Sequence, residues 1–277
     1  MKSFPRSLLF VPAHQPRMLA RAWHAGAEAL VLDLEDSVPP DEKAAARAAV
    51  AALAPPDTWT GRVFARVNAW GLPEFADDAR ALAGSRIDGV VLPKSERADD
   101  VRQAAAALES APAIVLLVET ARGVVRAAEL ADSGIARLAG LAFGAEDYRA
   151  SMDAGVSPDP ALFDFARISV ATAAVAAGVT AIDAPELDVA DLDGLRAATR
   201  RARGLGFRAK FAIHPSQVPV IHEALGDRDA ERAWAARVVE AYDRAAADGR
   251  GAAALDGRMI DRATVRRARA ILERADD

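Results

Sequence analysis

The chain of 277 residues contains no cysteine, four lysines and two tyrosines. Without cysteine, disulfides, thiolate metal sites, iron–sulfur clusters and a cysteine nucleophile are all excluded. The same absence is typical of a reducing compartment, so we expect a cytoplasmic protein. No run of about 18 apolar residues is present, and the first residues lack the layout of a signal peptide. We therefore expect neither a membrane-spanning helix nor a secretory signal.

Negative charge exceeds positive charge, and nearly all of the positive charge is carried by arginine. The chain has 35 Lys and Arg against 40 Asp and Glu, a formal net charge of −5. A protein that follows nucleic-acid phosphates usually carries a basic excess, so we expect no nucleic-acid partner. Because lysine is so rare, Lys94, which ends an apolar run, is a candidate for a specific role.

Short apolar runs rich in Val, Ile and Leu alternate with longer segments of helical periodicity, in about eight pairs. Their spacing is that of a βα unit, and their continuous apolar character is typical of parallel strands covered on both faces. No GxGxxG sequence follows any run, which argues against a doubly wound dinucleotide-binding fold. The pattern predicts an α/β fold, a (β/α)8 TIM barrel with extra C-terminal helices. The expected strands are 7–12, 29–35, 62–68, 88–94, 113–120, 138–147, 180–186 and 208–215.

The segment after the eighth pair exceeds a minimal barrel. It contains two helical stretches, 230–247 and 261–275, joined by a glycine-rich bend at 248–257. We predict a catalytic barrel over residues 1–225 and a C-terminal helical extension over 226–277 that caps the barrel or meets another subunit. A loop inserted at 152–160 is expected before the sixth helix.

Charged residues gather where the apolar runs end, and in a barrel these ends form the active-site face. Several carboxylates placed in a partly dry cavity are unfavourable unless a cation neutralises them. A divalent ion is the simplest remedy, and an oxygen-rich site without cysteine favours Mg²⁺ or Mn²⁺. The best ligand pair is Glu119 with Asp147, with Glu146 as the rival of Asp147. The other polar residues at run ends are Asp33, Glu35, Asp36, Arg66, Asn68, Lys94, Asp183 and His214.

Three of these residues have two interpretations each. Arg66 is either a clamp on a substrate carboxylate, which we favour, or part of a structural ion pair. Lys94 is either the Schiff-base amine of a metal-free aldolase or an ion-pair partner of nearby carboxylates such as Glu35 or Asp33, and we favour the ion pair. His214 is more often a structural group than a ligand. A metal beside a carboxylate clamp suits a 2-oxo or 2-hydroxy acid and favours enolate chemistry such as carbon–carbon cleavage.

The run-end motifs, taken in order, resemble those of the HpcH/HpaI aldolase and citrate lyase β-subunit family. The resemblance spans almost the whole chain, and the combination is specific although each piece alone is weak. The matching segments are RSLLFVP at 6–12, PRM at 16–18, LDLEDSV at 32–38, RVN at 66–68, LPK at 92–94, ETARG at 119–123, FGAEDY at 143–148, IHPSQ at 213–217 and GRMID at 257–261. One departure is Trp70, which could reshape an acyl pocket.

The resemblance implies roles for particular residues. Glu119 and Asp147 would bind Mg²⁺, Glu119 also contacting substrate, and Arg66 would hold the substrate carboxylate. In acyl-CoA lyase relatives an Asp in the position of Asp261 enters a neighbouring subunit's site, so Asp261 would be an acid/base residue acting in trans. The further expected site residues are Glu35, as a catalytic group, and Asp36 and Lys94, as substrate contacts.

The resemblance also implies an activity and an assembly. The activity is reversible Claisen-type cleavage of a short hydroxy-dicarboxylic acyl thioester of the citryl-, malyl- or citramalyl-CoA kind. The assembly is a homotrimer, or a hexamer of two trimers. Three alternatives stay open: a 2-oxo-acid aldolase, an acyl-CoA thioesterase on the same metal site, and a subunit of a multi-chain lyase that needs an acyl-carrier protein as partner.

Overall fold

The computed structural model describes residues 4–155, 161–226, 228–247 and 252–276, and it divides into two compact units. One unit is Pro5–Leu225, and the other is formed by the C-terminal segment Gly226–Asp277 together with the first residues of the chain. Each unit has a hydrophobic core of its own. Parts of the expected loop at 152–160 and of the expected bend at 248–257 lie outside the described residues.

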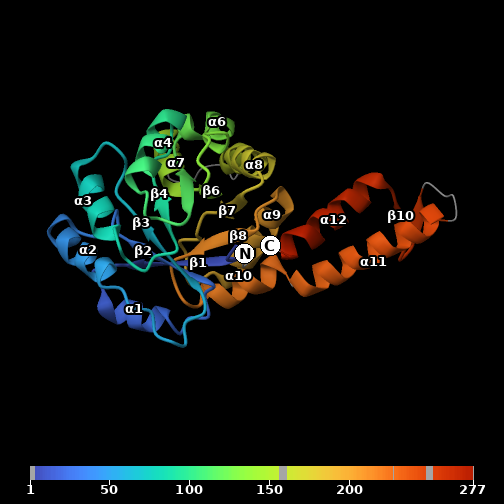
Figure 1. Ribbon diagram of the computed structural model, residues 1–277, viewed down its shortest axis with the longest axis horizontal. Helices are drawn as coiled ribbons and strands as arrows, with labels where there is room; N and C mark the ends of the chain where they lie inside the picture. Colours follow the sequence, from blue (N-terminus) through green and yellow to red (C-terminus); the bar gives the residue numbers. More distant parts are fainter. Residues whose placement is uncertain (1–3, 156–160, 227, 248–251, 277) are drawn as a thin grey trace. The chain divides into compact units, whose positions relative to one another are not determined.

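The first unit is a closed barrel of eight parallel strands with helices around it (Figure 1), which confirms the predicted (β/α)8 fold. Each strand pairs with the next in sequence, and the first pairs with the eighth through Ser7 and Lys210. The strands lie within the expected runs, and all but the first end two to four residues earlier. They are β1 (Ser7–Pro12), β2 (Ala29–Asp33), β3 (Arg62–Arg66), β4 (Gly89–Leu92), β5 (Ile114–Val118), β6 (Leu138–Phe143), β7 (Thr180–Asp183) and β8 (Ala209–Ala212).

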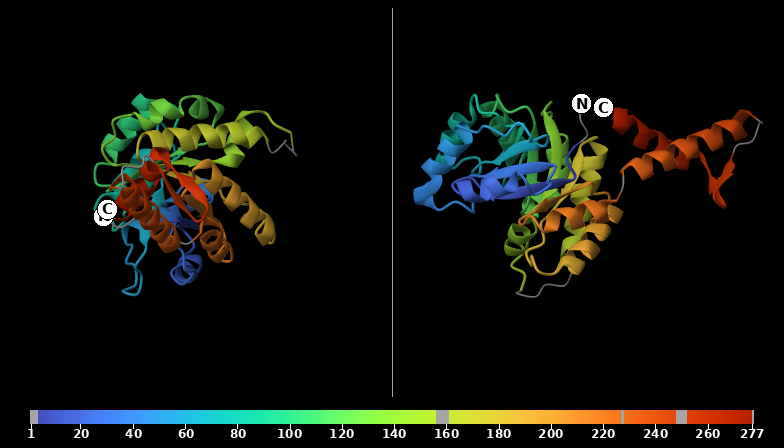
Figure 2. Two further views of the ribbon diagram at one scale, coloured as in Figure 1. Left: turned by 90° about the vertical axis from the view of Figure 1, so that its right-hand side faces the viewer. Right: turned by 90° about the horizontal axis from the view of Figure 1, so that it is seen from below.

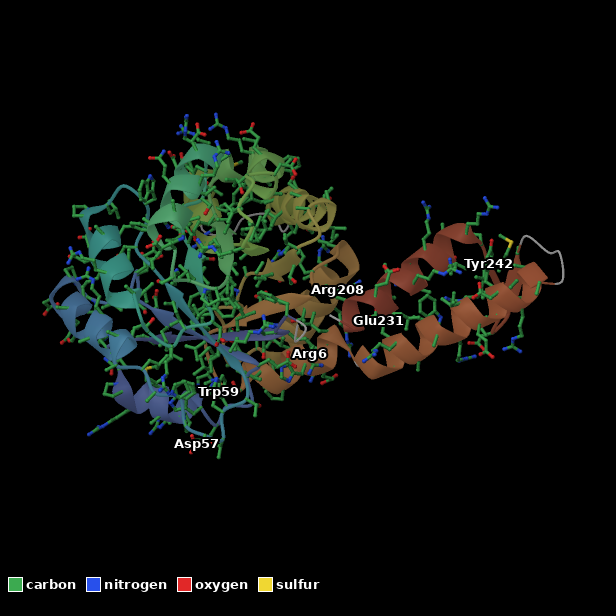
Figure 3. The ribbon with its side chains drawn as sticks, viewed as in Figure 1. Arg6, Asp57, Trp59, Arg208, Glu231 and Tyr242 are labelled. Atoms are coloured by element: carbon green, nitrogen blue, oxygen red, sulfur yellow. The ribbon has the colours of Figure 1, made fainter. Side chains whose placement is uncertain are left out.

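The apolar runs are continuous because both faces of the sheet are buried. In β2, Leu30 and Leu32 belong to the core shared with the surrounding helices, and Val31 at the alternate position faces the barrel interior. Both side chains of such a pair are removed from water, so a polar residue within a strand needs buried partners, as Lys210 has in Asp183 and the carbonyl of Ala184. Trp59, labelled in Figure 3, precedes β3 and packs edge-on against Trp23, with 5.0 Å between the ring centroids.

The helices of the barrel unit follow the strands, and Figure 2 shows them from two further directions. The segment 121–131 forms two short helices, because the backbone leaves helical geometry at Arg126. No helix in the described part of the chain is both long and apolar enough to cross a membrane. The helices are α1 (Pro16–Ala22), the 3₁₀ helix η1 (Pro40–Glu42), α2 (Lys43–Ala51), α3 (Pro73–Leu82), α4 (Ala98–Ala107), α5 (Ala121–Val125), α6 (Ala127–Ala131), α7 (Ala145–Ser151), α8 (Ala161–Ala176), α9 (Leu192–Leu205) and α10 (Gln217–Leu225).

The C-terminal unit is a helical hairpin with a small β-hairpin between its helices. The helices α11 (Arg228–Ala247) and α12 (Arg262–Asp276) lie side by side, and Tyr242 packs on the core between them (Figure 3). The strands β9 (Ala253–Leu255) and β10 (Arg258–Ile260) pair antiparallel across Asp256 and Gly257, both with positive φ. Two such residues favour a tight hairpin turn. The sequence pattern predicted only a glycine-rich bend here, at 248–257.

Candidate active site

The ends of β2 and β3 bring Asp33 and Arg66 together. The parallel register pairs these two residues, and the guanidinium donates two hydrogen bonds of 2.7 Å each, from Nε and Nη2, to the two oxygens of Asp33. Burial alone would raise the pKa of Asp33, but the hydrogen bonds and charge of Arg66 hold it below its ordinary value. The result is a fixed ion pair at the mouth of the barrel, one of the two interpretations given to Arg66.

The third nitrogen of Arg66 faces other groups. Its Nη1 lies 3.2 Å from Oε2 of Glu35 and 3.7 Å from Oδ2 of Asp36, and the guanidinium stacks over the Phe10 ring at 4.9 Å. The Nε and Nη2 edge of the guanidinium is therefore occupied by the buried Asp33 carboxylate, and one of its faces by the Phe10 ring. Arg66 also lines a cavity at the barrel mouth, so the structural ion pair and the carboxylate clamp are compatible in one residue.

Glu35 is a buried carboxyl with an unusual environment. Its Oε2 accepts no hydrogen bond from the described residues. Burial raises the pKa of Glu35 to about 8, and the negative charges of Glu119 and Asp36 add to the effect against the opposing charge of Arg66. Near neutral pH this group can both donate and accept a proton, which suits an acid/base role.

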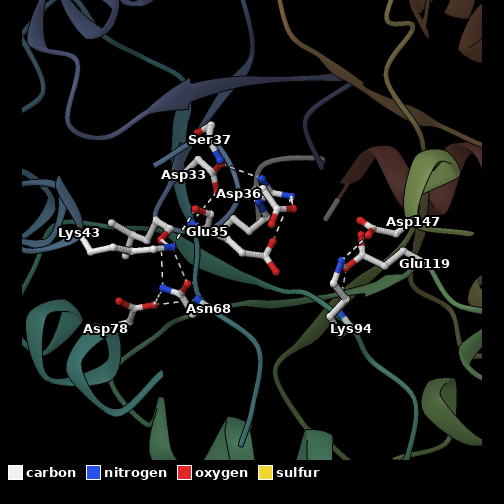
Figure 4. Close-up of polar contacts among 12 residues, drawn as sticks. Asp33, Glu35, Asp36, Ser37, Lys43, Asn68, Asp78, Lys94, Glu119 and Asp147 are labelled. Carbon is white, nitrogen blue, oxygen red and sulfur yellow. Dashed lines mark hydrogen bonds and ion pairs between the residues drawn. The ribbon is translucent and has the colours of Figure 1, made fainter. Parts of the chain in front are cut away.

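A lysine fixes the backbone that carries Glu35. Lys43 Nζ, from the start of α2, donates to the carbonyls of Leu34 and Glu35 at 2.7 and 2.8 Å and to Oδ1 of Asn68 at 2.7 Å (Figure 4). Asn68 in turn donates its backbone and side-chain N–H groups to Asp78, each at 2.7 Å. Sequence reasoning missed this support, although the rarity of lysine was a usable signal.

Across the mouth, Lys94 joins Glu119 and Asp147 (Figure 4). Its Nζ lies 2.7 Å from Oδ1 of Asp147 and 3.5 Å from Oε1 of Glu119, and its backbone N–H donates to the same Oε1 at 2.8 Å. The favoured ion pair is therefore present, but its partners are not the expected Glu35 or Asp33. Helix α7 begins after Gly144, so Asp147 lies in the first turn of this helix and is not its N-cap.

Glu119 is held in a tight, dry position. Its side chain is 3% exposed, and burial raises its pKa to about 7. A Cβ at Gly144 would lie 2.5 Å from Cβ and 2.7 Å from Oε2 of Glu119, so only glycine fits there. The rival ligand Glu146 pairs with Arg149 instead. Of the two acids, Asp147 is thus the one brought to Glu119.

A cavity of about 110 Å³ lies at the barrel mouth between these groups. Arg66 contributes to its wall, as do Glu119 and Asp147, and two aromatic rings that sequence reasoning did not single out, Phe10 and Phe211. Trp70 is not among the lining residues; it packs edge-on against Phe75. The complete lining is Phe10, Arg66, Leu117, Glu119, Phe143, Gly144, Ala145, Glu146, Asp147, Pro185, Leu187 and Phe211.

A second buried charge cluster supports the cavity wall. Lys210, fully buried on β8, donates to Oδ2 of Asp183 and to the carbonyl of Ala184, both at 2.6 Å. Arg167 donates to the other Asp183 oxygen at 2.8 Å. These bonds fix the segment after β7, which supplies Pro185 and Leu187 to the cavity.

The donor set fits a hard divalent cation with open coordination positions. No group of three or more His, Asp or Glu residues within the described ranges could hold a metal by itself. Glu119, which is buried, and Asp147, which is 41% exposed, offer carboxylate oxygens, and two acids at a partly dry site favour a cation. Mg²⁺ commonly binds through one or two carboxylates and completes its shell with water and substrate oxygens.

Two other expected residues lie elsewhere. Asp261 belongs to the C-terminal unit, where it precedes α12 and accepts hydrogen bonds from the backbone and hydroxyl of Thr264 at 2.8 and 2.9 Å. These bonds lower the pKa of this exposed carboxyl. His214 contacts the hydroxyl of Ser216 at 2.7 Å through Nδ1, a local turn contact in keeping with a structural role.

Comparison with known proteins gives a family match over most of the chain. The model of the HpcH/HpaI aldolase/citrate lyase family matches residues 6–215. A citrate lyase subunit beta-like protein of Mycobacterium tuberculosis is 39% identical, over 97% of this chain and 95% of that protein. A (3S)-malyl-CoA thioesterase of Cereibacter sphaeroides is 32% identical, over 98% of this chain and 94% of its own. The crystal structure of CitE from Mycobacterium tuberculosis in complex with magnesium, acetoacetate and coenzyme A matches with a TM-score of 0.80 and 36% identity, over 99% of each chain.

Proposed function

The chain belongs to the HpcH/HpaI aldolase/citrate lyase family, and from this membership and the geometry of the barrel mouth we propose that it is a Mg²⁺-dependent carbon–carbon lyase. Its substrate would be a short hydroxy-dicarboxylic acyl thioester, such as citryl-, malyl- or citramalyl-CoA. The observation that carries the proposal is the meeting of Glu119 and Asp147 at one cavity with Arg66. A cation site and a carboxylate clamp then face the same space.

Each residue of the site would have its own role in the reaction. Glu119 and Asp147 hold the cation, and Arg66, which lines the same cavity, orients the substrate carboxylate while Asp33 fixes the plane of the guanidinium. Glu35 moves a proton, because its pKa of about 8 lies near neutral pH. Asp36, which is 62% exposed beside Arg66, contacts substrate or water at the rim.

The metal would supply Lewis-acid chemistry. When bound, Mg²⁺ would polarise the oxygens of the substrate and stabilise the negative charge that develops as the carbon–carbon bond breaks. The phenylalanine rings and the buried carboxylates exclude water from the same space. Support for this assignment comes from the Mycobacterium tuberculosis CitE structure, which contains magnesium, acetoacetate and coenzyme A.

We further propose that Asp261 acts in trans as an acid/base residue and that the chain forms a homotrimer or a hexamer. The support is the position of Asp261 in a unit with its own core, outside the barrel that holds the other site residues. The carboxyl is exposed and its pKa is low, so it is ionised and accessible at neutral pH.

Thioester hydrolysis is the second candidate function. It is favoured by the 32% identity to a (3S)-malyl-CoA thioesterase over nearly the full length of both chains. In hydrolysis, water would cleave the thioester bond and the carbon–carbon bond would stay intact, with Glu35 acting as the base. The two functions use one site and differ in their products.

Product analysis tests the proposal and separates the candidates. The purified chain is incubated with malyl-CoA, citramalyl-CoA or citryl-CoA, with Mg²⁺ or with EDTA, and the products are resolved by chromatography. A lyase releases a shorter acyl-CoA and an oxo acid, whereas a thioesterase releases free CoA and a hydroxy acid. Turnover that persists in EDTA would contradict the metal role, and borohydride trapping on Lys94 would then identify a Schiff-base aldolase. Activity only after addition of an acyl-carrier protein would identify a lyase subunit.

A further inference from the structure

Among the described residues, Lys94 is the one that forms ion pairs with Glu119 and Asp147, the two proposed metal ligands. Lys94 Nζ lies 2.7 Å from Asp147 and 3.5 Å from Glu119, and the Lys94 backbone N–H also donates to Glu119 (Figure 4). Glu119 is nearly fully buried, whereas Asp147 is 41% exposed and Lys94 32% exposed. The ammonium therefore sits at the open side of the pair, on the path by which a cation would arrive.

The backbone of Lys94 is adapted to this position. Its φ is +51°, in the left-handed region that residues with a side chain rarely adopt. In this conformation the backbone N–H of Lys94 points at Glu119, and its ammonium points at Glu119 and Asp147. Strained backbone of this kind persists where the surrounding structure holds it, and it is concentrated at functional sites.

The ammonium and a metal ion compete for the same oxygens. A divalent cation that binds Glu119 and Asp147 needs the oxygen atoms that Lys94 now contacts, and two cations at one carboxylate pair repel each other. The lysine side chain is flexible and partly exposed, so it has room to withdraw. Without Lys94, the two acids would repel each other in a partly dry site.

We propose that Lys94 is a positioning residue that holds Glu119 and Asp147 in place as a resident counter-cation and is displaced when the metal binds. This inference rests on the proposed metal site. It separates Lys94 from a Schiff-base role, in which the amine would have to be uncharged and free to attack a carbonyl. It also predicts that competition outweighs the ordering of the ligands, so that the lysine weakens metal affinity, whereas a contact that only ordered the ligands would strengthen it.

Calorimetric titration of Mg²⁺ into the full-length chain, freed of metal with EDTA and then dialysed, tests the inference. We expect Lys94→Met to bind Mg²⁺ about tenfold more tightly than the wild type, because the competing charge is gone. The matched control is Arg97→Met. Arg97 lies three residues after Lys94 and is paired with Asp100, so this variant also removes one positive charge. Its affinity should stay within about twofold of the wild type, since exposed charges are screened.

Amine labelling of the wild type gives a second measurement that needs no variant. Reductive methylation followed by peptide mass spectrometry should show Lys94 labelled several-fold faster in Mg²⁺ than in EDTA. Lys43, held by three oxygens, and the fully buried Lys210 serve as internal controls whose labelling should not change.

The outcomes separate the two levels of the argument. Mg²⁺ binding that is equal or weaker in Lys94→Met, or Lys94 labelling that does not respond to bound Mg²⁺, overturns the displacement but leaves the proposed metal site. An absence of Mg²⁺ binding in the wild type, Arg97→Met and Lys94→Met overturns the proposed metal site and the displacement together. If Lys94→Met does not fold, labelling of the wild type decides.

Discussion

Arg66 and Asp33, the last residues of neighbouring strands, face each other in register and share two parallel hydrogen bonds of 2.7 Å. Asp33 is 1% exposed and Arg66 13% exposed, so the pair is formed out of water. The orientation of the guanidinium is thereby set by the barrel itself. The proposed clamp depends on a carboxylate that is not among the residues lining the cavity.

Asp33→Asn should harm both stability and substrate binding. It removes the bidentate partner of Arg66 and leaves only the longer contacts to Glu35 and Asp36, so we expect a loss of about 3 kcal/mol in the free energy of unfolding and a KM at least about tenfold higher. Urea unfolding and steady-state kinetics measure the two effects. Asp36→Asn, 62% exposed and 3.7 Å from the same guanidinium, is the control and should change stability by less than about 0.5 kcal/mol. Equal loss in both variants would contradict the role of the fixed pair.

Glu35→Gln should change how stability depends on pH. The folded state raises the pKa of Glu35 from 4.5 to about 8, so between these values it binds a proton that the unfolded chain has lost. Wild-type stability contributed by this group therefore falls as pH rises from 4.5 toward 8 and is constant above. The glutamine variant lacks this dependence and should gain about 3 to 5 kcal/mol over the wild type between pH 5 and pH 8.5. Denaturant unfolding across this range measures the difference; parallel curves would exclude a raised pKa.

Gly144→Ala should remove Mg²⁺ binding. The added methyl group would meet Glu119 at 2.5 Å, so the carboxylate must leave its position or the chain must shift, at a cost of about 1 to 3 kcal/mol. Gly204→Ala, in α9, is the matched control, because no heavy atom lies within 4 Å of the place its methyl carbon would take. It should stabilise the chain by about 0.5 to 1 kcal/mol and leave the Mg²⁺ affinity unchanged. Calorimetry and thermal unfolding report both; normal Mg²⁺ affinity in Gly144→Ala would contradict the proposed ligand geometry.

Asp261→Ser separates a helix cap from a catalytic acid. Serine can accept the hydrogen bonds that Asp261 takes from Thr264, so α12 should keep its stability within about 0.5 kcal/mol. If Asp261 acts in trans, turnover should fall by at least about 100-fold with Mg²⁺ binding intact. Mixed oligomers of Arg66→Ala and Asp261→Ser chains should regain activity, since each supplies what the other lacks. Unchanged turnover in Asp261→Ser would exclude the trans role.

Much of the barrel could be predicted because a strand that is buried on both faces consists of a nearly uninterrupted run of apolar residues. The run through Leu30 and Leu32 shows this, and the charge at Asp33 marks where the strand ends. The hairpin of β9 and β10 could not be predicted in the same way. Its strands are three residues long and mostly exposed, so they carry no long apolar run, and the Asp256-Gly257 dipeptide, which is typical of a tight hairpin turn, was the usable signal.

The candidate site was predictable as a set of strand-end residues, but not as a set of contacts. The pairing of Lys94 with Asp147 depends on the left-handed backbone of Lys94, which residue type alone does not reveal. Phe10 and Phe211 were hidden for the opposite reason, because an aromatic ring within an apolar run is indistinguishable from ordinary core. The tilted contact between these rings, 4.8 Å between centroids, exists only once the first and eighth strands are adjacent.

The pairing of Ser7 with Lys210 joins the two ends of the barrel sequence, whereas every other neighbouring pair of strands is consecutive. Such a closure brings together segments far apart along the chain and is therefore slow compared with local pairing. During synthesis on the ribosome, β1 keeps an unpaired edge until β8 has emerged, and an unpaired edge invites association with other chains. Emergence of the eighth strand is thus the event that turns an aggregation-prone open sheet into one without edges.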